Sequence, residues 1–192
     1  MSQSMGELTV RESVDWTATV YDPACTRCSL CREATTVCVP GRGNPRAEIM
    51  LVGEAPGAQE DKRGLPFVGK AGRRLSELLA EAEIDESRVW FTNAARCFPS
   101  VTRTPKDFHL AKCADYLWAE IEHIQPKVIV ALGKSATKLF VATKAGMGRI
   151  RGQPRVVDIG TDLKDEDGKP VTLHIPVVPT WHPSYVMRVE SD

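Results

Sequence analysis

Hydrophobic residues along the chain form short unbroken runs that alternate with segments of helical spacing. The clearest runs are 48–53, 89–93 and 127–133, and each ends in glycine or asparagine. Runs of this length without polar alternation are typical of strands buried on both faces of a sheet. One or two more strands are predicted within Val171–Thr180.

The segments between these runs predict helices. Residues 69–82 place apolar side chains on one face with a charged face opposite, and 107–124 reads as a long helix that ends at Gln125-Pro126. Asp107 is the expected N-cap of that helix, and 135–143 is a shorter helix behind a strand. Strands and helices in this order predict an α/β fold of three layers, αβα, with a mostly parallel central sheet of about four strands. The polar, turn-rich segment 160–170 is the predicted tip of a hairpin.

Composition restricts the classes of function. At 192 residues the chain has room for one domain, which we place at 21–192, after a poorly specified arm at 1–20. Lys plus Arg number 25 and Asp plus Glu number 25, so the formal net charge is zero. This excludes binding of nucleic acid by bulk positive charge and leaves only a local patch. With no secretion signal and no long apolar run, we expect a soluble, cytoplasmic protein.

Chemically capable side chains follow several of the predicted strands. In open α/β sheets, ligands bind beyond the carboxyl ends of the strands. Glu54, Asn93 and His182 all fall at such ends. An amide can pair with the edge of a base, and an imidazole can donate to developing negative charge. A lone histidine is more often structural, but His182 falls at the same edge as Glu54 and Asn93, and together they favour a site. The turn Gly133-Lys134-Ser135 lacks the upstream glycine of a phosphate-binding loop and is interpreted as a strand-to-helix connection.

Other residues near these ends have two interpretations. Phe67, in a loop rich in Gly and Pro, is either a core residue or a stacking surface for a base. Glu60 and Asp61 follow Glu54 closely, and a solvated acidic loop is the commoner explanation for such carboxylates. The three remaining histidines are interpreted as structural: His109, His123 and His174.

Six cysteines require an explanation of their own. Without a secretion signal, disulfides are not expected. The pair Cys25-x2-Cys28 is typical of metal or cluster ligands. A local zinc site would add Cys31 and Cys38, whereas a long-range set would add Cys97 and Cys113, and spacing alone does not decide between them.

Four motifs together resemble the uracil-DNA glycosylase superfamily, most closely its iron–sulfur branch, family 4. They are 53–57, 64–72, 92–93 and 182–184, and the likeness extends from about Cys25 to Tyr185. The resemblance implies a monofunctional DNA repair glycosylase that flips out uracil and hydrolyses its N-glycosidic bond, which leaves an abasic site. It implies uracil-containing DNA as the partner, and we expect a monomer without membrane attachment.

The resemblance also implies roles for individual residues. Asn93 would read the edge of uracil, Phe67 would stack on its face, and His182 would hydrogen-bond the O2 atom. Glu54 would position water or stabilise the cationic sugar, and backbone around Ala55 and Gly57 would cradle the base. A [4Fe-4S] cluster would add a loop region to the fold, with Cys31 and Cys38 as extra thiols and these ligands: Cys25, Cys28, Cys97 and Cys113.

Two departures leave questions open. Ala55 stands where some branches have a water-activating Asp, so Glu60 and Asp61 remain candidate bases. The loop 98–105 is also unusual, so a glycosylase for another modified or deaminated base, or a catalytically silent iron–sulfur DNA-binding protein, stays possible. The expected DNA contacts are Arg103, Ser184 and the wedge residue Tyr185, with further candidates among the surface cations Arg42, Arg46, Lys62, Arg63, Lys70, Arg73, Arg74, Arg96, Arg149 and Arg151.

Overall fold

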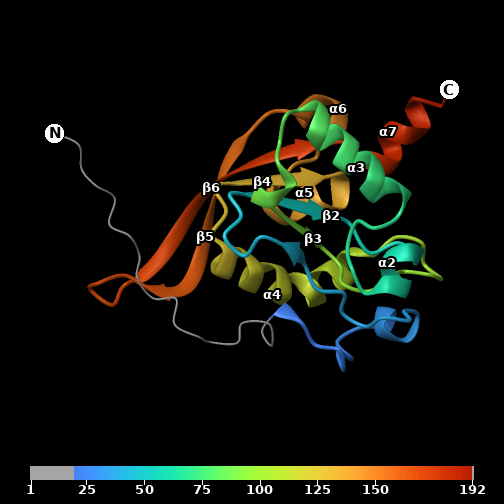
Figure 1. The fold of residues 1–192 in the computed structure, drawn as a ribbon. Helices are drawn as coiled ribbons and strands as arrows, with labels where there is room; N and C mark the ends of the chain where they lie inside the picture. Colours follow the sequence, from blue (N-terminus) through green and yellow to red (C-terminus); the bar gives the residue numbers. More distant parts are fainter. Residues whose placement is uncertain (1–19, 192) are drawn as a thin grey trace.

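A computed structural model describes residues 20–191, and its centre is a six-stranded sheet (Figure 1). The strand order is β1-β3-β2-β4-β6-β5; the four inner strands pair in parallel and the two outer strands pair antiparallel. The mostly parallel sheet is confirmed, but its size is not, because β1 and β5 were not predicted. All but one residue of the arm predicted at 1–20 lie outside the described part. The strands are β1 (Arg42–Gly43), β2 (Ile49–Gly53), β3 (Val89–Asn93), β4 (Val128–Leu132), β5 (Arg155–Lys164) and β6 (Pro170–Thr180).

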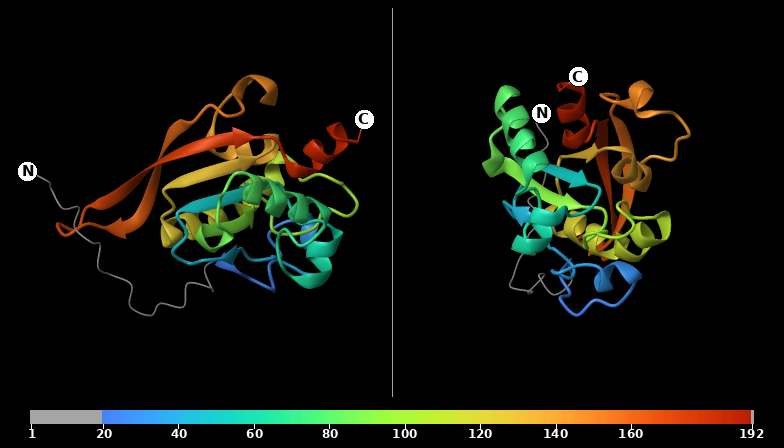
Figure 2. Two further views of the ribbon diagram at one scale, coloured as in Figure 1. Left: turned by 45° about the horizontal axis from the view of Figure 1, so that its top comes forward. Right: turned by 90° about the vertical axis from the view of Figure 1, so that its right-hand side faces the viewer.

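Helices cover both faces of the sheet, as the three-layer prediction requires (Figure 2). On one face, Leu75 and Leu79 of α3 pack against Leu51 and Phe91. On the other face, α4 contributes to the larger apolar core, which also contains inward-facing residues of β2, β4 and β6. No helix among residues 20–191 is long and apolar enough to cross a membrane. The helices are α2 (Ala58–Arg63), α3 (Lys70–Glu81), α4 (Asp107–Ile124), α5 (Lys134–Phe140), α6 (Met147–Ile150) and α7 (Pro183–Val189), with 3-10 turns η1 (Ser29–Arg32) and η2 (Glu86–Arg88).

Helix α4 has the predicted length, but its N-cap residue differs from the prediction. The N-cap is Lys106, whose backbone N–H donates to His109 Nδ1 at 3.0 Å. Asp107 is the first helical residue, and it pairs with Lys138 at 3.2 Å. The helix ends where Gln125 adopts a left-handed conformation, with φ of 49°, directly before Pro126. An acid in the first turn suits the positive end of the helix dipole whether or not it caps.

The predicted hairpin is present, and its two strands extend well beyond the predicted tip. Strands β5 and β6 form a ribbon that projects away from the body of the molecule, at the opposite end from α7 (Figures 1 and 2). The turn at its tip is closed by the backbone N–H of Gly168, which donates to the carbonyl of Asp165 at 2.9 Å. The inner half of β6 joins the parallel sheet beside β4 and leads directly to His182.

Candidate active site and cysteine cluster

The carboxyl ends of the parallel strands bring the predicted residues to one edge. Gly53 of β2 is in register with Asn93 of β3, and Leu132 of β4 with Thr180 of β6. Glu54 directly follows β2, and His182 begins α7 two residues after β6. The prediction that these side chains share one edge of the sheet follows from this topology.

Phe67 and Asn93 pack closely against Gly53, and we refer to these three residues as the base slot. A β-carbon built at Gly53 would lie 2.6 Å from Phe67 Cζ and closer still to Asn93 Oδ1. Only glycine therefore fits beside both the amide and the ring. Asn93 is 5% exposed and Phe67 8% exposed, and the Phe67 ring centroid lies 6.0 Å from that of Phe91. The slot presents an aromatic side and an amide, which suits a flat polar ring.

The loop that carries Phe67 is held rigidly. Phe67 has a positive φ of 55°, which is uncommon for an aromatic residue. Arg42 Nε donates to the carbonyl of Pro66 at 2.8 Å, and its guanidinium lies over the Phe91 ring at 4.6 Å. A β-carbon at Gly72 would collide with the Phe67 carbonyl, so glycine allows α3 to approach the loop. Arg42, a candidate DNA contact from sequence, instead supports the slot.

Glu60 and Asp61 are buried and engaged by backbone groups. The Glu60 carboxylate accepts from the N–H groups of Gly57, Val68 and Gly69, at 3.1, 2.9 and 2.6 Å. Asp61 accepts from the N–H groups of Thr35 and Thr36, each at 3.0 Å. Glu60 thus joins the two loops beside the slot, and Asp61 ties α2 to the cysteine-rich segment. Neither forms the solvated acidic loop that composition suggested, and these contacts favour a structural role over that of a base.

Glu54 has a partner that sequence reasoning missed. The hydroxyl of Ser135 donates to Glu54 Oε2 at 2.5 Å. The turn 133–135 is a strand-to-helix connection as predicted, yet it also orients this carboxylate. The signal was available, since Ser135 follows a strand at the same edge of the sheet. What sequence did not show is that β4 lies directly beside β2.

His182 is the N-cap of α7 and is oriented by that helix. Its Nδ1 accepts from the backbone N–H of Ser184 at 3.2 Å and lies 2.8 Å from the Ser184 hydroxyl. In the neutral ring the proton is therefore on Nε2, which is free to donate. Burial lowers the pKa of His182, and the Arg188 charge lowers it further, while the carboxylates of Glu54 and Glu60 oppose this. Gly133 allows the approach, since a β-carbon there would lie 3.2 Å from His182 Cβ.

The predicted DNA contacts are exposed on two separate segments. Ser184 and Tyr185 stand in the first turn of α7, next to His182, and Tyr185 is 39% exposed. The Tyr185 ring stacks on Trp181, with centroids 4.4 Å apart and planes at 26°. Arg103 lies on the loop between β3 and α4 and has a φ of 62°. Tyr185 thus stands on a rigid aromatic base beside the site.

All six cysteines are free thiols, and five interact across the chain. The Cys97 thiol interacts electrostatically with those of Cys28, Cys38 and Cys113, and Cys28 interacts with Cys25. Burial, reinforced by the neighbouring thiols, raises the pKa of Cys97 to about 12 and that of Cys113 to about 11. A thiolate cluster here therefore needs a bound cation to stabilise it.

The buried thiols form a donor set that an iron–sulfur cluster can use. Among residues 20–191, no three His, Cys, Asp or Glu side chains are grouped closely enough to hold one metal ion. A multi-iron cluster is larger and takes soft thiolates that stand farther apart. Backbone N–H groups already point at two of these sulfurs: that of Cys38 at Cys97 Sγ, at 3.3 Å, and that of Arg96 at Cys113 Sγ. Such bonds favour the charged form of the sulfur.

A buried ion pair lies beside these thiols. Arg96 is 1% exposed and Glu120 is fully buried; their side chains pair at 2.8 Å, and Glu120 also accepts from the N–H of Gly41 at 3.0 Å. Within the described residues the Arg96 Nε–H, also buried, has no acceptor. The prediction that Arg96 is a surface cation for DNA is wrong. Its guanidinium instead interacts with Cys38 and Cys113.

Comparisons with known proteins agree with this geometry. The family model described as the uracil DNA glycosylase superfamily matches residues 40–192. A type-4 uracil-DNA glycosylase of Thermotoga maritima is 43% identical over 169 residues, which cover 88% of this chain and 80% of the relative. One from Archaeoglobus fulgidus is 36% identical over 173 residues, 88% of this chain and 84% of the relative. A type-5 uracil-DNA glycosylase of Thermus thermophilus is 40% identical over 122 residues, 54% of each chain.

Proposed function

Because the chain belongs to the uracil DNA glycosylase superfamily, we propose that it releases uracil from DNA by hydrolysing the N-glycosidic bond. The product is DNA with an abasic site, and the strand itself stays intact. The observation that carries this proposal is the packing of Phe67 and Asn93 against Gly53, with Glu54 and His182 at the same edge of the sheet. Extensive similarity to type-4 glycosylases supports it over most of the chain.

The slot can distinguish uracil from cytosine by hydrogen-bond pattern. The Asn93 amide offers one acceptor oxygen and N–H donors. Uracil presents an N3–H donor beside the O4 acceptor, which matches this set, whereas cytosine presents the opposite pattern. A site built to pair these groups rejects the wrong base strongly, because a buried polar group would be left unpaired. Phe67 supplies the stacking face, and Gly53 leaves the space.

Bond cleavage needs stabilisation at both ends of the breaking bond. The sugar becomes oxocarbenium-like while negative charge develops on the departing base. We assign His182 to the base: its neutral ring carries the free Nε2–H, which donates to O2 as charge grows there. Glu54 faces the sugar end, where a carboxylate held by Ser135 stabilises positive charge or orients the attacking water. Ala55 and Gly57 contribute the backbone around the base.

The cysteines would hold a [4Fe-4S] cluster through Cys25, Cys28, Cys97 and Cys113. The interactions of Cys28 with the other three thiols and the backbone N–H groups aimed at Cys97 and Cys113 support this set. Cys38 also interacts with Cys25, Cys97 and Cys113. When bound, such a cluster supplies a covalent link between distant segments and no step of the hydrolysis. It would join the segment before β1 to the loop after β3 and to α4, which lie next to the slot. By holding the loop after β3, these four cysteines would keep Asn93 and its neighbours in position.

The test is a denaturing gel of an end-labelled oligonucleotide that contains one uracil. After incubation with protein, each sample is divided and half is treated with hot alkali. Wild type should give a shortened band only after alkali. Removal of one donor to developing charge costs on the order of 10²–10³ in rate, so His182→Ala should lose the product band at matched times. His174→Ala, an exposed histidine on the hairpin, serves as the matched control.

Other outcomes discriminate the alternatives. Wild type that leaves uracil uncut but cuts a substrate with another deaminated base would move the assignment to that base. Wild type that binds DNA and cuts none of them would contradict catalysis altogether. A slow band that survives denaturation would mean a covalent adduct in place of turnover.

A further inference from the structure

A second hollow lies on the flank of the site, between α3 and α7. Its volume is about 570 Å³, and its lining is separate from the residues of the base slot. It is lined by Lys70, Ala71, Ser184, Met187, Arg188 and Ser191. Ser184 belongs to both regions, since its backbone and hydroxyl also orient His182. The hollow is therefore contiguous with the reaction site without being part of the slot.

The hollow has two cations without a counter-charge. Within residues 20–191, neither the Lys70 ammonium nor the Arg188 guanidinium makes a hydrogen bond or an ion pair, and Arg188 has only a ring contact with Tyr185, at 5.9 Å. No acidic side chain lines the hollow. The Ser191 hydroxyl donates to the Met187 carbonyl at 2.6 Å, so it is not a free donor. The available donors are thus the two exposed cations.

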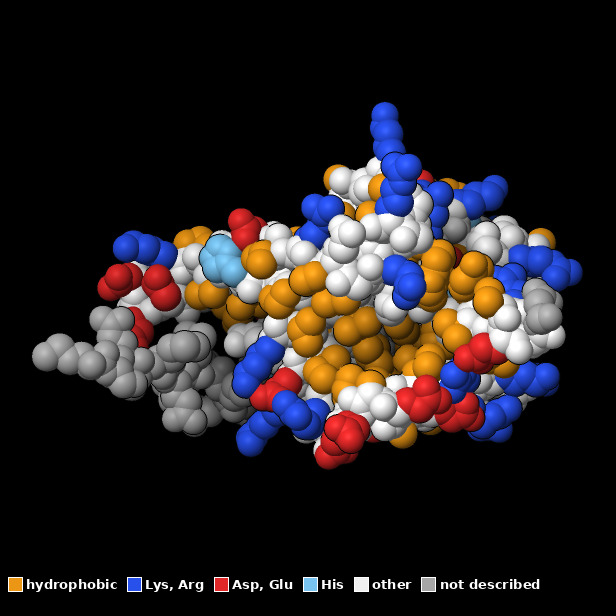
Figure 3. All heavy atoms as spheres, turned by 90° about the horizontal axis from the view of Figure 1, so that it is seen from above, with side chains coloured by type: hydrophobic (Ala, Val, Ile, Leu, Met, Phe, Trp, Pro, Cys, Tyr) orange, Lys and Arg blue, Asp and Glu red, His pale blue; other side chains and the backbone are white. Residues whose placement is uncertain are grey.

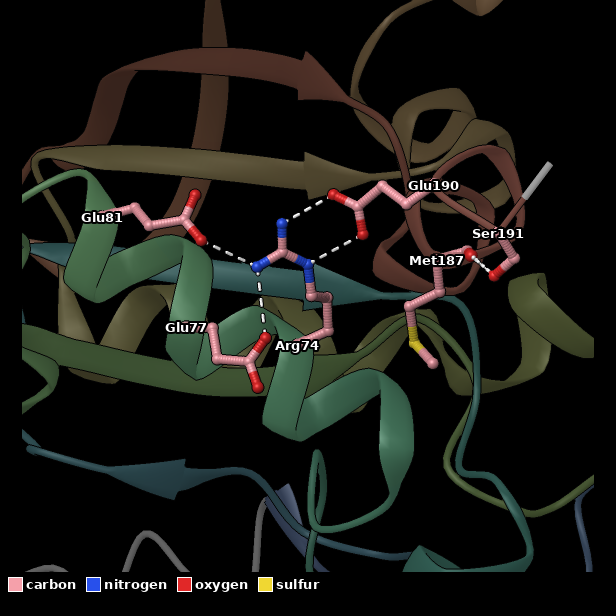
Figure 4. A network of polar contacts seen from close by, with 6 residues as sticks. All are labelled: Arg74, Glu77, Glu81, Met187, Glu190 and Ser191. Carbon is pink, nitrogen blue, oxygen red and sulfur yellow. Dashed lines mark hydrogen bonds and ion pairs between the residues drawn. The ribbon is translucent and has the colours of Figure 1, made fainter.

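Arg74 binds three carboxylates near the hollow, and its single positive charge offsets one of their three negative charges. Its guanidinium donates to both oxygens of Glu190, at 2.7 and 3.2 Å, to Glu81 at 2.8 Å and to Glu77 at 3.2 Å (Figure 4). Arg74, a candidate DNA contact from sequence, is therefore engaged in ion pairs within the protein. The two-pronged pairing with Glu190 also ties the end of α7 to α3. It consequently fixes the spacing between Lys70 on α3 and Arg188 on α7.

We propose that this hollow binds a backbone phosphate of the DNA strand that enters the base slot. This rests on the proposed function, which supplies the DNA, and it adds a place where the strand is held. Lys70 and Arg188 neutralise the phosphate from two helices. Because Arg188 is near enough to His182 to affect its protonation, a phosphate held here lies beside the reacting nucleotide. A protein of zero net charge needs such a local site to grip DNA.

The test measures the salt dependence of binding to undamaged DNA. Fluorescence anisotropy of a labelled duplex gives the dissociation constant across a series of salt concentrations. Loss of one phosphate contact lowers the slope of log affinity against log salt by about 0.9 on a duplex. Lys70→Met should show this reduction, and Lys70→Arg, which keeps the charge, should restore the slope. Lys164→Met, on the projecting hairpin, removes the same charge far from the site and should leave the slope unchanged.

The outcomes separate this proposal from the proposed function. The phosphate site is overturned if Lys70→Met has the same slope as wild type. It is also overturned if Lys164→Met lowers the slope as much as Lys70→Met does. Uracil release by wild type is measured in parallel. If wild type releases no uracil but Lys70→Met still lowers the slope, the glycosylase proposal fails and the phosphate site stands. Both substituted positions, Lys70 and Lys164, are exposed, so the fold is expected to persist, which circular dichroism checks.

Discussion

The His182 ring is largely removed from water, while its Nε2 atom stays available for the proposed reaction. Its Nδ1 accepts from Ser184, and burial disfavours the charged form, so the pKa of His182 lies below its ordinary value of about 6.5. Protonation of Nδ1 would set two N–H groups against each other. The neutral ring is thus the form that both the helix cap and the proposed reaction use. The Glu54 carboxylate opposes the shift and prevents it from being larger.

This gives a prediction for pH dependence. Since kcat/KM reports ionisations of the free enzyme, uracil release should stay on its plateau as the pH falls through about 6.5 and decline only below that value. In the unfolded chain histidine binds its proton first, so the same shift lowers the free energy of unfolding below about pH 6.5. If uracil release by both wild type and the His174→Ala control declined around that pH or above it, the assignment would be contradicted. The direct check is the NMR titration of the His182 ring, where Glu54→Gln should lower the pKa further.

At the scale of single residues, the sequence indicated where the site residues lie but not which side chains they contact. Glu54, Asn93 and His182 follow strand ends, and strand ends are legible from hydrophobic runs. The contact of Ser135 with Glu54 depends on which strands are neighbours, which no local pattern encodes. The burial of Arg96 has the same cause, because a long cationic side chain is buried or exposed according to its tertiary neighbours.

Among the elements, α3 and α4 were predicted nearly to the residue and α7 was missed. Long amphipathic segments carry a strong periodic signal, whereas α7 has only seven residues, most of which are exposed. Strand β5 was missed for a related reason. It pairs on one side only, most of its residues are exposed, and its polar composition resembles a loop. Figure 3 shows apolar side chains gathered near the middle of one face, with charged side chains scattered around them.

Helix α7 depends on α3 for its position, and this can be measured. Arg74→Met removes all four contacts to Glu77, Glu81 and Glu190, so the end of α7 loses its tie. Hydrogen exchange should show faster exchange of α7 amides while those of α4 keep their protection. KM for uracil-containing DNA should rise, because His182 is the N-cap of the loosened helix. Arg73→Met, an exposed neighbour on α3, is the matched control.

Equal protection of α7 in the two variants would show that packing alone positions the helix. An increase in exchange throughout the sheet would instead mean general destabilisation, and it would contradict a local role for the ion pairs. The contacts are partly exposed, with the three carboxylates 48–62% accessible, so high salt should weaken them. Exchange of α7 in wild type should accordingly be faster at high salt.

Across the whole molecule, the slot and the hairpin tip are at opposite ends, and the cysteines lie beside the slot end. Sequence predicted this layout only as far as the strand order and the motif resemblance allowed. It left two ligand sets open, since spacing does not say which distant cysteines meet. The structure brings Cys97 and Cys113 into the same core cluster and packs Cys28 against it. Cys25 and Cys38 are buried on Tyr116 of α4, and Cys31, which interacts with Cys28, packs against the same core cluster as Cys28.

The ligand set predicts which substitutions remove the cluster. Protein purified without oxygen should contain iron and sulfide and absorb visible light, and Cys97→Ser should lose these and unfold at lower temperature. Cys31→Ser is the matched control: its thiol only donates to the Cys28 carbonyl, at 3.1 Å, so iron should be retained. A local zinc site predicts the reverse, because Cys31 would then be a ligand and Cys97 would not. Zinc in wild type, or iron lost equally from both variants, would contradict the proposed set. Because the cluster joins the segment before β1 to the loop that follows Asn93, its loss should weaken uracil binding before it unfolds the sheet.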